Sequence, residues 1–190
     1  MSGVKYSGWI LIGLCLLMAA TRFDHFGSLT TLPDASLAIF FFGGLYLRNS
    51  PWFILLLAEG ALIDFIAVQY GGVSNYCISP AYVFLIPTYG VLWVSGYFCN
   101  RYNVFSARGI ITCGGILIAA TSVAFLISNS SFYVYSGRFT DLTWLEYARK
   151  VVQYYPAYLL STLIYASMAV LIHAARRLSE HRSRREGNRF

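Results

Sequence analysis

The stretch GIITCGGILIAATSVAFLI, residues 109–127, contains 19 residues without a charged side chain. An α-helix of that length extends about 28 Å, close to the ~30 Å hydrocarbon core of a bilayer. Two more uncharged runs, 81–98 and 151–172, have similar lengths. Runs of this kind predict membrane-spanning helices, so they decide the fold class. We expect an all-α integral membrane protein.

The rest of the composition agrees with that class. Only 12% of the 190 residues are charged, against about 25% in a typical soluble domain. Three further candidate spans complete a bundle of six transmembrane helices, at 6–21, 35–47 and 51–70. The second is short, and the first also resembles a signal peptide, although we expect it to be retained as a helix.

One membrane domain is predicted over 1–190, with the six-helix bundle in 1–175 and a basic tail in 176–190. The net charge is +6, and six of the fourteen basic residues lie in the tail. With six spans, ten basic residues fall on the tail's side of the membrane and four on the other, Arg22 among them. This bias predicts that both termini are cytoplasmic. The charge therefore marks topology, and no nucleic-acid partner is expected.

Two acids lie inside the candidate span 51–70. An intramembrane carboxylate is costly and usually marks a functional site, so Asp64 is a candidate for binding, with pairing to a neighbouring helix as the structural alternative. For Glu59 the two interpretations are equally favoured. The acids are five residues apart, which rotates them by about 140° on a helix, so they are expected to face different directions.

Cys77 stands in an uncharged connection between two spans, in the stretch YGGVSNYCISPAYVF (70–84). Ser79 is expected to cap the next helix and Pro80 to occupy its first position. The free N–H groups of such a helix start favour a thiolate, which is a soft ligand for a transition metal. Taken alone, the same cysteine is slightly better explained as an inert loop residue.

His25 and Tyr82 complete the candidate site. Taken alone, His25 is typical of a solvated side chain at the membrane interface, and Tyr82 is typical of the aromatic belt. The six-span topology nevertheless brings both to the outer end of the bundle together with Asp64 and Cys77. A further outer connection, 128–150, is long enough to be a lid or a binding loop, and its part 141–150 could form a short interfacial helix before the last span. The chain contains no P-loop, no zinc-protease motif and no nucleophile elbow, which excludes ATP hydrolysis by a P-loop.

The stretch NYCISPAYVFLIPTYGVLW, together with the chain length and the six predicted spans, resembles the BtuM family of small bacterial cobalamin (vitamin B12) transporters. That family is related to the substrate-binding S components of energy-coupling factor transporters. The resemblance implies uptake of cobalamin across the bacterial inner membrane, with cobalamin as substrate and no resident cofactor. Cys77 matches the cobalt-ligating cysteine, while His25, Asp64 and Tyr82 match polar positions near the corrinoid.

The resemblance also implies that Cys77 could act catalytically, by displacing cyanide from cyanocobalamin. S components that dock on an energy-coupling module often carry A-x-x-x-A in the first helix. Here that helix offers only Cys15 and Ala19 at the spacing, so a solitary transporter in the lipid bilayer is expected. Two alternatives remain, a thiol-dependent membrane enzyme and an S-type binding protein for another vitamin.

Overall fold

The structure is a computed structural model that describes the backbone of residues 2–22, 32–104 and 106–187. Side chains are described over the same ranges except at 2–6, 77, 176–178 and 180–187. The elements are α1 (Ser2–Arg22), α2 (Ser36–Tyr46), α3 (Ser50–Tyr70), η1 (Asn75–Cys77), η2 (Pro80–Phe84), α4 (Leu85–Cys99), α5 (Ala107–Tyr135), α6 (Trp144–Val151), η3 (Val152–Tyr154) and α7 (Tyr155–Gly187). Within these ranges the chain is all-helical, as predicted.

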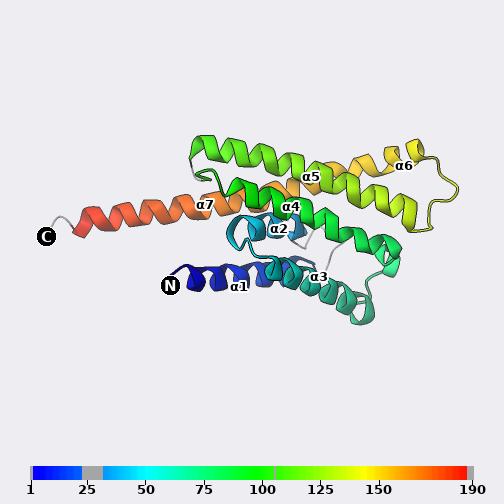
Figure 1. The fold of residues 1–190 in the computed structure, drawn as a ribbon, viewed down its shortest axis with the longest axis horizontal. Helices are drawn as coiled ribbons and strands as arrows, with labels where there is room; N and C mark the ends of the chain where they lie inside the picture. The colour runs from blue at the N-terminus through cyan, green and yellow to red at the C-terminus, as the bar shows by residue number, and fades with distance from the viewer. Residues whose placement is uncertain (1, 23–31, 105, 188–190) are drawn as a thin grey trace.

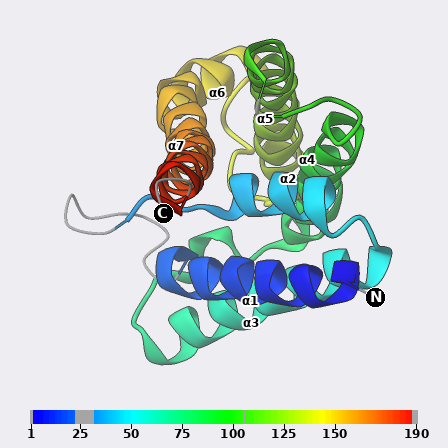
Figure 2. The same ribbon diagram turned by 90° about the vertical axis from the view of Figure 1, so that its left-hand side faces the viewer.

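Helix α2 lies at the centre of the molecule. It packs against α1 and α3 on one side and against α4 and α7 on the other (Figure 2). Nine of its 11 residues are buried, because apolar side chains cover its whole circumference. At 1.5 Å per residue it extends about 16 Å, half the thickness of a hydrocarbon core. The predicted span 35–47 is therefore a short, internal helix in this structure.

Two glycines allow the backbones of α2 and α4 to touch. A Cβ atom at Gly44 would collide with the backbone oxygen of Trp93, and one at Gly96 with the backbone oxygen of Phe41. Small residues at helix contacts are how membrane helices approach closely, since lipid supplies no hydrophobic drive between them. The α2–α4 contact is thus fixed by glycines on both helices.

The connection predicted over 128–150 is mostly helical. The extension of α5 into it corrects the expected end of that span, whereas α6 agrees with the short helix expected over 141–150. Helix α5 continues to Tyr135, because 128–135 contains no helix breaker, and the chain turns at Gly137 with a φ of 68°. Helix α6 then begins after Thr143, whose side chain accepts a hydrogen bond from the N–H of Glu146 in a capping box. The non-helical part is only 136–143.

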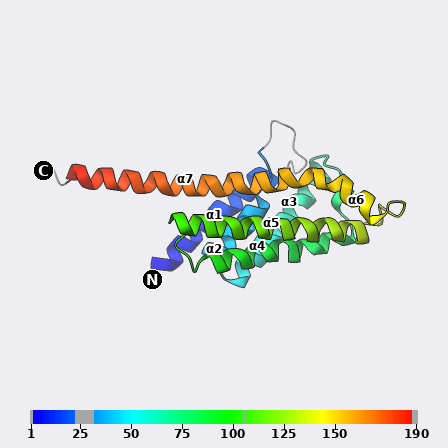
Figure 3. The same ribbon diagram turned by 90° about the horizontal axis from the view of Figure 1, so that it is seen from above.

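Four of the described helices are long and apolar enough to cross a membrane: Ser50–Tyr70, Pro80–Cys99, Ala107–Tyr135 and Trp144–Ala175. The last one combines α6, η3 and the first part of α7. The beginning of α1 and the end of α7 lie toward the same end of the molecule (Figure 1). Helix α7 extends far beyond the bundle, into the tail predicted from 176 onward (Figure 3).

Candidate functional site

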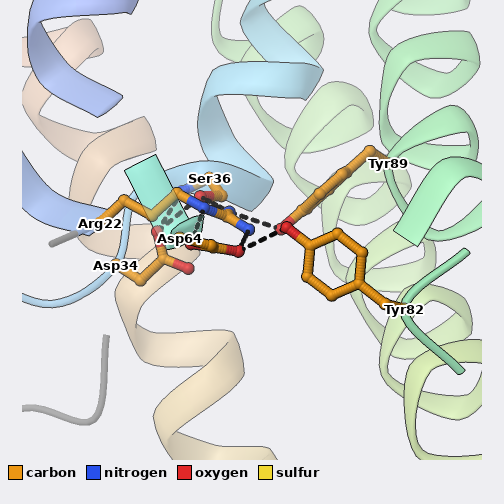
Figure 4. A network of polar contacts seen from close by, with 6 residues as sticks. All are labelled: Arg22, Asp34, Ser36, Asp64, Tyr82 and Tyr89. Carbon is orange, nitrogen blue, oxygen red and sulfur yellow. Dashed lines mark hydrogen bonds and ion pairs between the residues drawn. The ribbon is translucent and has the colours of Figure 1, made fainter. Parts of the chain in front are cut away.

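Arg22 is the last residue of α1, and its side chain is only 2% exposed. The sequence had placed it in an outer connection, so this assignment is wrong. The helix continues through Arg22, and the guanidinium turns inward between α2, α3 and α4, where acceptors from each surround it (Figure 4). A buried arginine in a membrane protein is costly unless it is paired, which makes its partners the core of the site.

Asp64 on α3 is the charged partner of Arg22. The Nε atom donates to Oδ1 at 2.8 Å and the Nη2 atom to Oδ2 at 2.7 Å. This bidentate geometry matches the planar guanidinium to the planar carboxylate and is the strongest form of such a pair. The predicted intramembrane acid is therefore paired with a neighbouring helix, as the structural alternative for Asp64 required.

The remaining nitrogen of Arg22 contacts two hydroxyls. Its Nη1 atom donates to Ser36 Oγ and to Tyr89 Oη, both at 2.7 Å. Ser36 is the first residue of α2, and its own hydroxyl donates to Asp34 Oδ1 at 2.6 Å. The Tyr89 ring stacks on Phe40 with centroids 4.2 Å apart. One guanidinium thereby joins α1 to α2, α3 and α4.

Tyr82 completes this arrangement from η2. Its hydroxyl donates to Asp64 Oδ2 at 2.7 Å (Figure 4). We call the connected set the Arg22 network; it comprises Arg22, Asp34, Ser36, Asp64, Tyr82 and Tyr89. The structure thus brings together two of the four predicted site residues, Asp64 and Tyr82, although they are 18 positions apart in the chain.

The hydrogen bonds of the network determine how many acceptor positions of the Asp64 carboxylate remain for a ligand. A carboxylate offers about four lone-pair positions, and three of them accept the bonds from Arg22 and Tyr82. The side chain of Asp64 is 18% exposed, against 2% for Arg22. One acceptor position and a partly open edge therefore remain for a hydrogen-bond donor from outside the network.

The other two predicted site residues are described less fully. Cys77 is the last residue of η1, five positions before Tyr82, but its side chain lies outside the described part of the structure. His25 lies outside the described residues altogether. Ser79 and Pro80 occupy the predicted first positions of the following helix, but that turn is a 3₁₀ helix and the Ser79 side chain makes no capping bond. The predicted cap at Ser79 is therefore wrong.

Aromatic side chains gather beside this segment. Tyr76 of η1 packs edge-on against Phe132 of α5, with ring centroids 5.6 Å apart, and Phe132 packs against Phe139 in the same way. Arg138 stands over the Tyr76 ring at 4.5 Å. The segment that carries Cys77 is thus held against α5 and the following turn by ring contacts.

Sequence reasoning missed Arg22, although a signal was available. An acid within an apolar run needs a partner, and an arginine directly after another apolar run is a candidate for it, although the same position is common for an arginine at the membrane surface. Comparison with protein-family models and with curated proteins found no match for this chain.

Proposed function

We propose that this protein is a multi-pass transporter of the bacterial inner membrane that takes up cobalamin from the outside. The observation that carries the proposal is the bond between Tyr82 and Asp64, two residues chosen from the sequence as substrate-binding positions. Both belong to the same end of α3 and α4 as the connection that contains Cys77. The four long apolar helices support a membrane location.

The proposed topology has six spans with both termini in the cytoplasm. Ten of the fourteen basic residues would then lie inside, in keeping with the positive-inside rule. The beginning of α1 and the end of α7 lie toward the same end of the molecule (Figure 1), which supports an even number of membrane crossings. In this topology α2 is a short crossing helix that is enclosed by its neighbouring helices. Its length therefore need not match the thickness of the hydrocarbon core.

In the proposed mechanism, Cys77 is the cobalt ligand and the group that displaces cyanide. Its thiolate donates a sulfur lone pair to cobalt, and the bond between cobalt and the outgoing axial ligand breaks. Cyanide leaves with its electron pair, so the oxidation state of cobalt is unchanged. A soft thiolate suits a transition metal with an exchangeable position.

Asp64 and Tyr82 are proposed to contact the periphery of the corrinoid, whose amide side chains are hydrogen-bond donors and acceptors. Asp64 has one acceptor position left and a partly exposed edge. Tyr82 donates its hydroxyl hydrogen to Asp64, so its oxygen remains an acceptor. The neighbouring rings of Tyr76 and Phe132 offer apolar surface to a large, flat ligand.

The visible spectrum of the corrinoid tests this function directly. Purified protein is mixed with cyanocobalamin, and we expect a spectral change from cobalt–thiolate ligation together with release of cyanide. Cys77→Ser should abolish both, because oxygen is a harder and poorer ligand than thiolate sulfur. Cys113→Ser is the matched control, since that thiol is buried in the core.

A metal-free corrinoid separates cobalt ligation from the remaining contacts with the corrinoid. Native protein should bind cobalamin more tightly than the metal-free ligand, and Cys77→Ser should bind the two alike. If native protein and Cys77→Ser treat both ligands identically, cobalt ligation by Cys77 is wrong. Absence of any corrinoid binding would instead favour another vitamin or a thiol-dependent enzyme.

A further inference from the structure

The Arg22 network leaves the second intramembrane acid, Glu59, unexplained. Glu59 is the tenth of the 21 residues of α3. It is therefore about 14 Å from the beginning of the helix and about 17 Å from its end. If α3 crosses the bilayer, Glu59 is at its middle, the depth at which an ionised side chain is most costly.

The surroundings of Glu59 do little to stabilise a negative charge. Its Oε2 atom is buried and has no hydrogen-bond partner. Cys15 of α1 is within hydrogen-bonding reach of the carboxyl group, but a thiol is only a weak donor. Asp64, by contrast, receives three hydrogen bonds, two of them from a guanidinium.

No described cation compensates Glu59. Helices α1 and α2 pack against α3, and α4 and η2 also contact it, through Trp93 against Phe53 and through Tyr82 on Asp64. The described titratable side chains of these four elements are Cys15 and Arg22 on α1, Tyr46 on α2, Tyr82 on η2, and Tyr89, Tyr97 and Cys99 on α4. Arg22 uses four of its five N–H donors within the Arg22 network. The salt bridge between Arg22 and Asp64 is the only one among the described side chains.

A metal ion is a poor candidate for the positive charge that would compensate Glu59. Hard cations such as Ca²⁺ take six or more oxygen ligands, whereas the described residues contain no group of three or more acidic, histidine or cysteine side chains that could hold a metal. A single proton needs only one carboxylate. It also removes the charge, which lowers the cost of burial.

We propose that Glu59 is a proton-binding site at the middle of the membrane, and that it couples substrate uptake to the inward proton gradient. Glu59 takes a proton from the water on the outer side and returns it to the inner side as the protein changes conformation. The coupling rests on the proposed uptake function, whereas the proton site itself does not depend on the identity of the substrate.

Infrared spectroscopy of the protein in lipid vesicles tests the proton site without any substrate. We expect the C=O stretching band of a protonated carboxylic acid from Glu59. Glu59→Gln should remove it, Glu59→Asp should shift it, and Asp64→Asn should retain it. The aspartate variant keeps an acid, so the test survives if glutamine impairs folding. No band assignable to residue 59 would overturn the proton site.

Uptake of radiolabelled cyanocobalamin into the same vesicles tests the coupling. An inward gradient of one pH unit can drive about tenfold accumulation if one proton moves with each substrate, because one unit is a tenfold ratio of proton activity. Native protein should show this accumulation. Glu59→Gln should exchange cobalamin across the membrane without accumulating it.

The two measurements distinguish the failure of each proposal. Cobalamin uptake that is insensitive to the gradient in native protein would overturn the coupling and leave the proposed function standing. No uptake under any gradient would overturn the proposed function, while the infrared band would still decide whether Glu59 binds a proton. Accumulation by Glu59→Gln equal to that of native protein would place the coupling site elsewhere.

Discussion

Replacing Asp64 with asparagine removes the charged partner of Arg22 and preserves the shape of the side chain. Arg22 is 2% exposed, and its ion-pair contacts with Asp64 are 2.7 and 2.8 Å long. Removing one partner of a buried pair costs about 3–5 kcal/mol, because the other charge is left uncompensated. In a chain of this size each kcal/mol shifts Tm by about 2–4 °C, so we expect Asp64→Asn to lower Tm by roughly 6–20 °C.

A double variant separates the effect of the buried charge from the effect of side-chain volume. Replacing both partners, as Arg22→Met with Asp64→Leu, leaves no buried charge, and apolar replacement of a whole pair is often neutral. The double variant should therefore recover most of the stability that Asp64→Asn loses. Asp141→Asn is the matched control, because Asp141 is exposed and surface substitutions change stability by only about 0.5 kcal/mol.

The assay is a thermal unfolding scan in detergent micelles, followed by tryptophan fluorescence. A Tm for Asp64→Asn within about 2 °C of the native value, equal to that of the surface control, would refute the assignment of Arg22 and Asp64 as a buried ion pair. So would a double variant less stable than Asp64→Asn. Cobalamin binding by the stable double variant then reports whether Asp64 also serves the substrate.

Three other predictions follow from the packing and the topology. Gly96→Ala should lower Tm markedly, because its Cβ would strike the Phe41 backbone, whereas Gly114→Ala, with open space around it, should be neutral or stabilising by up to about 1 kcal/mol; similar Tm values for the two variants would contradict the α2–α4 contact. Ser79→Ala should keep or raise Tm, since the Ser79 hydroxyl is buried without a partner and such a group costs about 1–3 kcal/mol; a fall in Tm would show that the hydroxyl is bonded. In intact cells an impermeant maleimide should label Cys77 and leave the buried Cys99 unlabelled, and labelling of Cys99 from outside would contradict the proposed topology.

Much of the helical pattern could be predicted from the sequence because it depends on local composition. The predicted span 51–70 agrees with α3 to within one residue at each end, and 81–98 agrees equally well with the combined η2 and α4. Uncharged apolar runs of this length form helices in a membrane, since each backbone group must be paired within the segment. The end of α5 was placed too early because aromatic and polar residues continue a helix without an apolar signal.

The candidate site could be predicted only in part. Asp64 is visible in the sequence because a carboxylate in an apolar run is expensive whatever surrounds it. Its partner Arg22 is 42 positions earlier in the chain, at the end of a run, where an arginine is equally common at the membrane surface. The direction in which that side chain turns depends on the position of α2, α3 and α4, which no local pattern contains.

The sequence predicts a helical membrane protein without any tertiary information, because exposing an unpaired backbone group or a charge to lipid costs free energy at each residue where it occurs. It also singled out Asp64 and Tyr82 as residues of interest. The packing of separate helices was needed to show that Tyr82 is bonded to Asp64 and Asp64 to Arg22, and that Glu59 has no ion-pair partner among the described side chains. Those facts depend on short-range contacts between separate helices, which form only when α1 and α4 are packed beside α2 and α3.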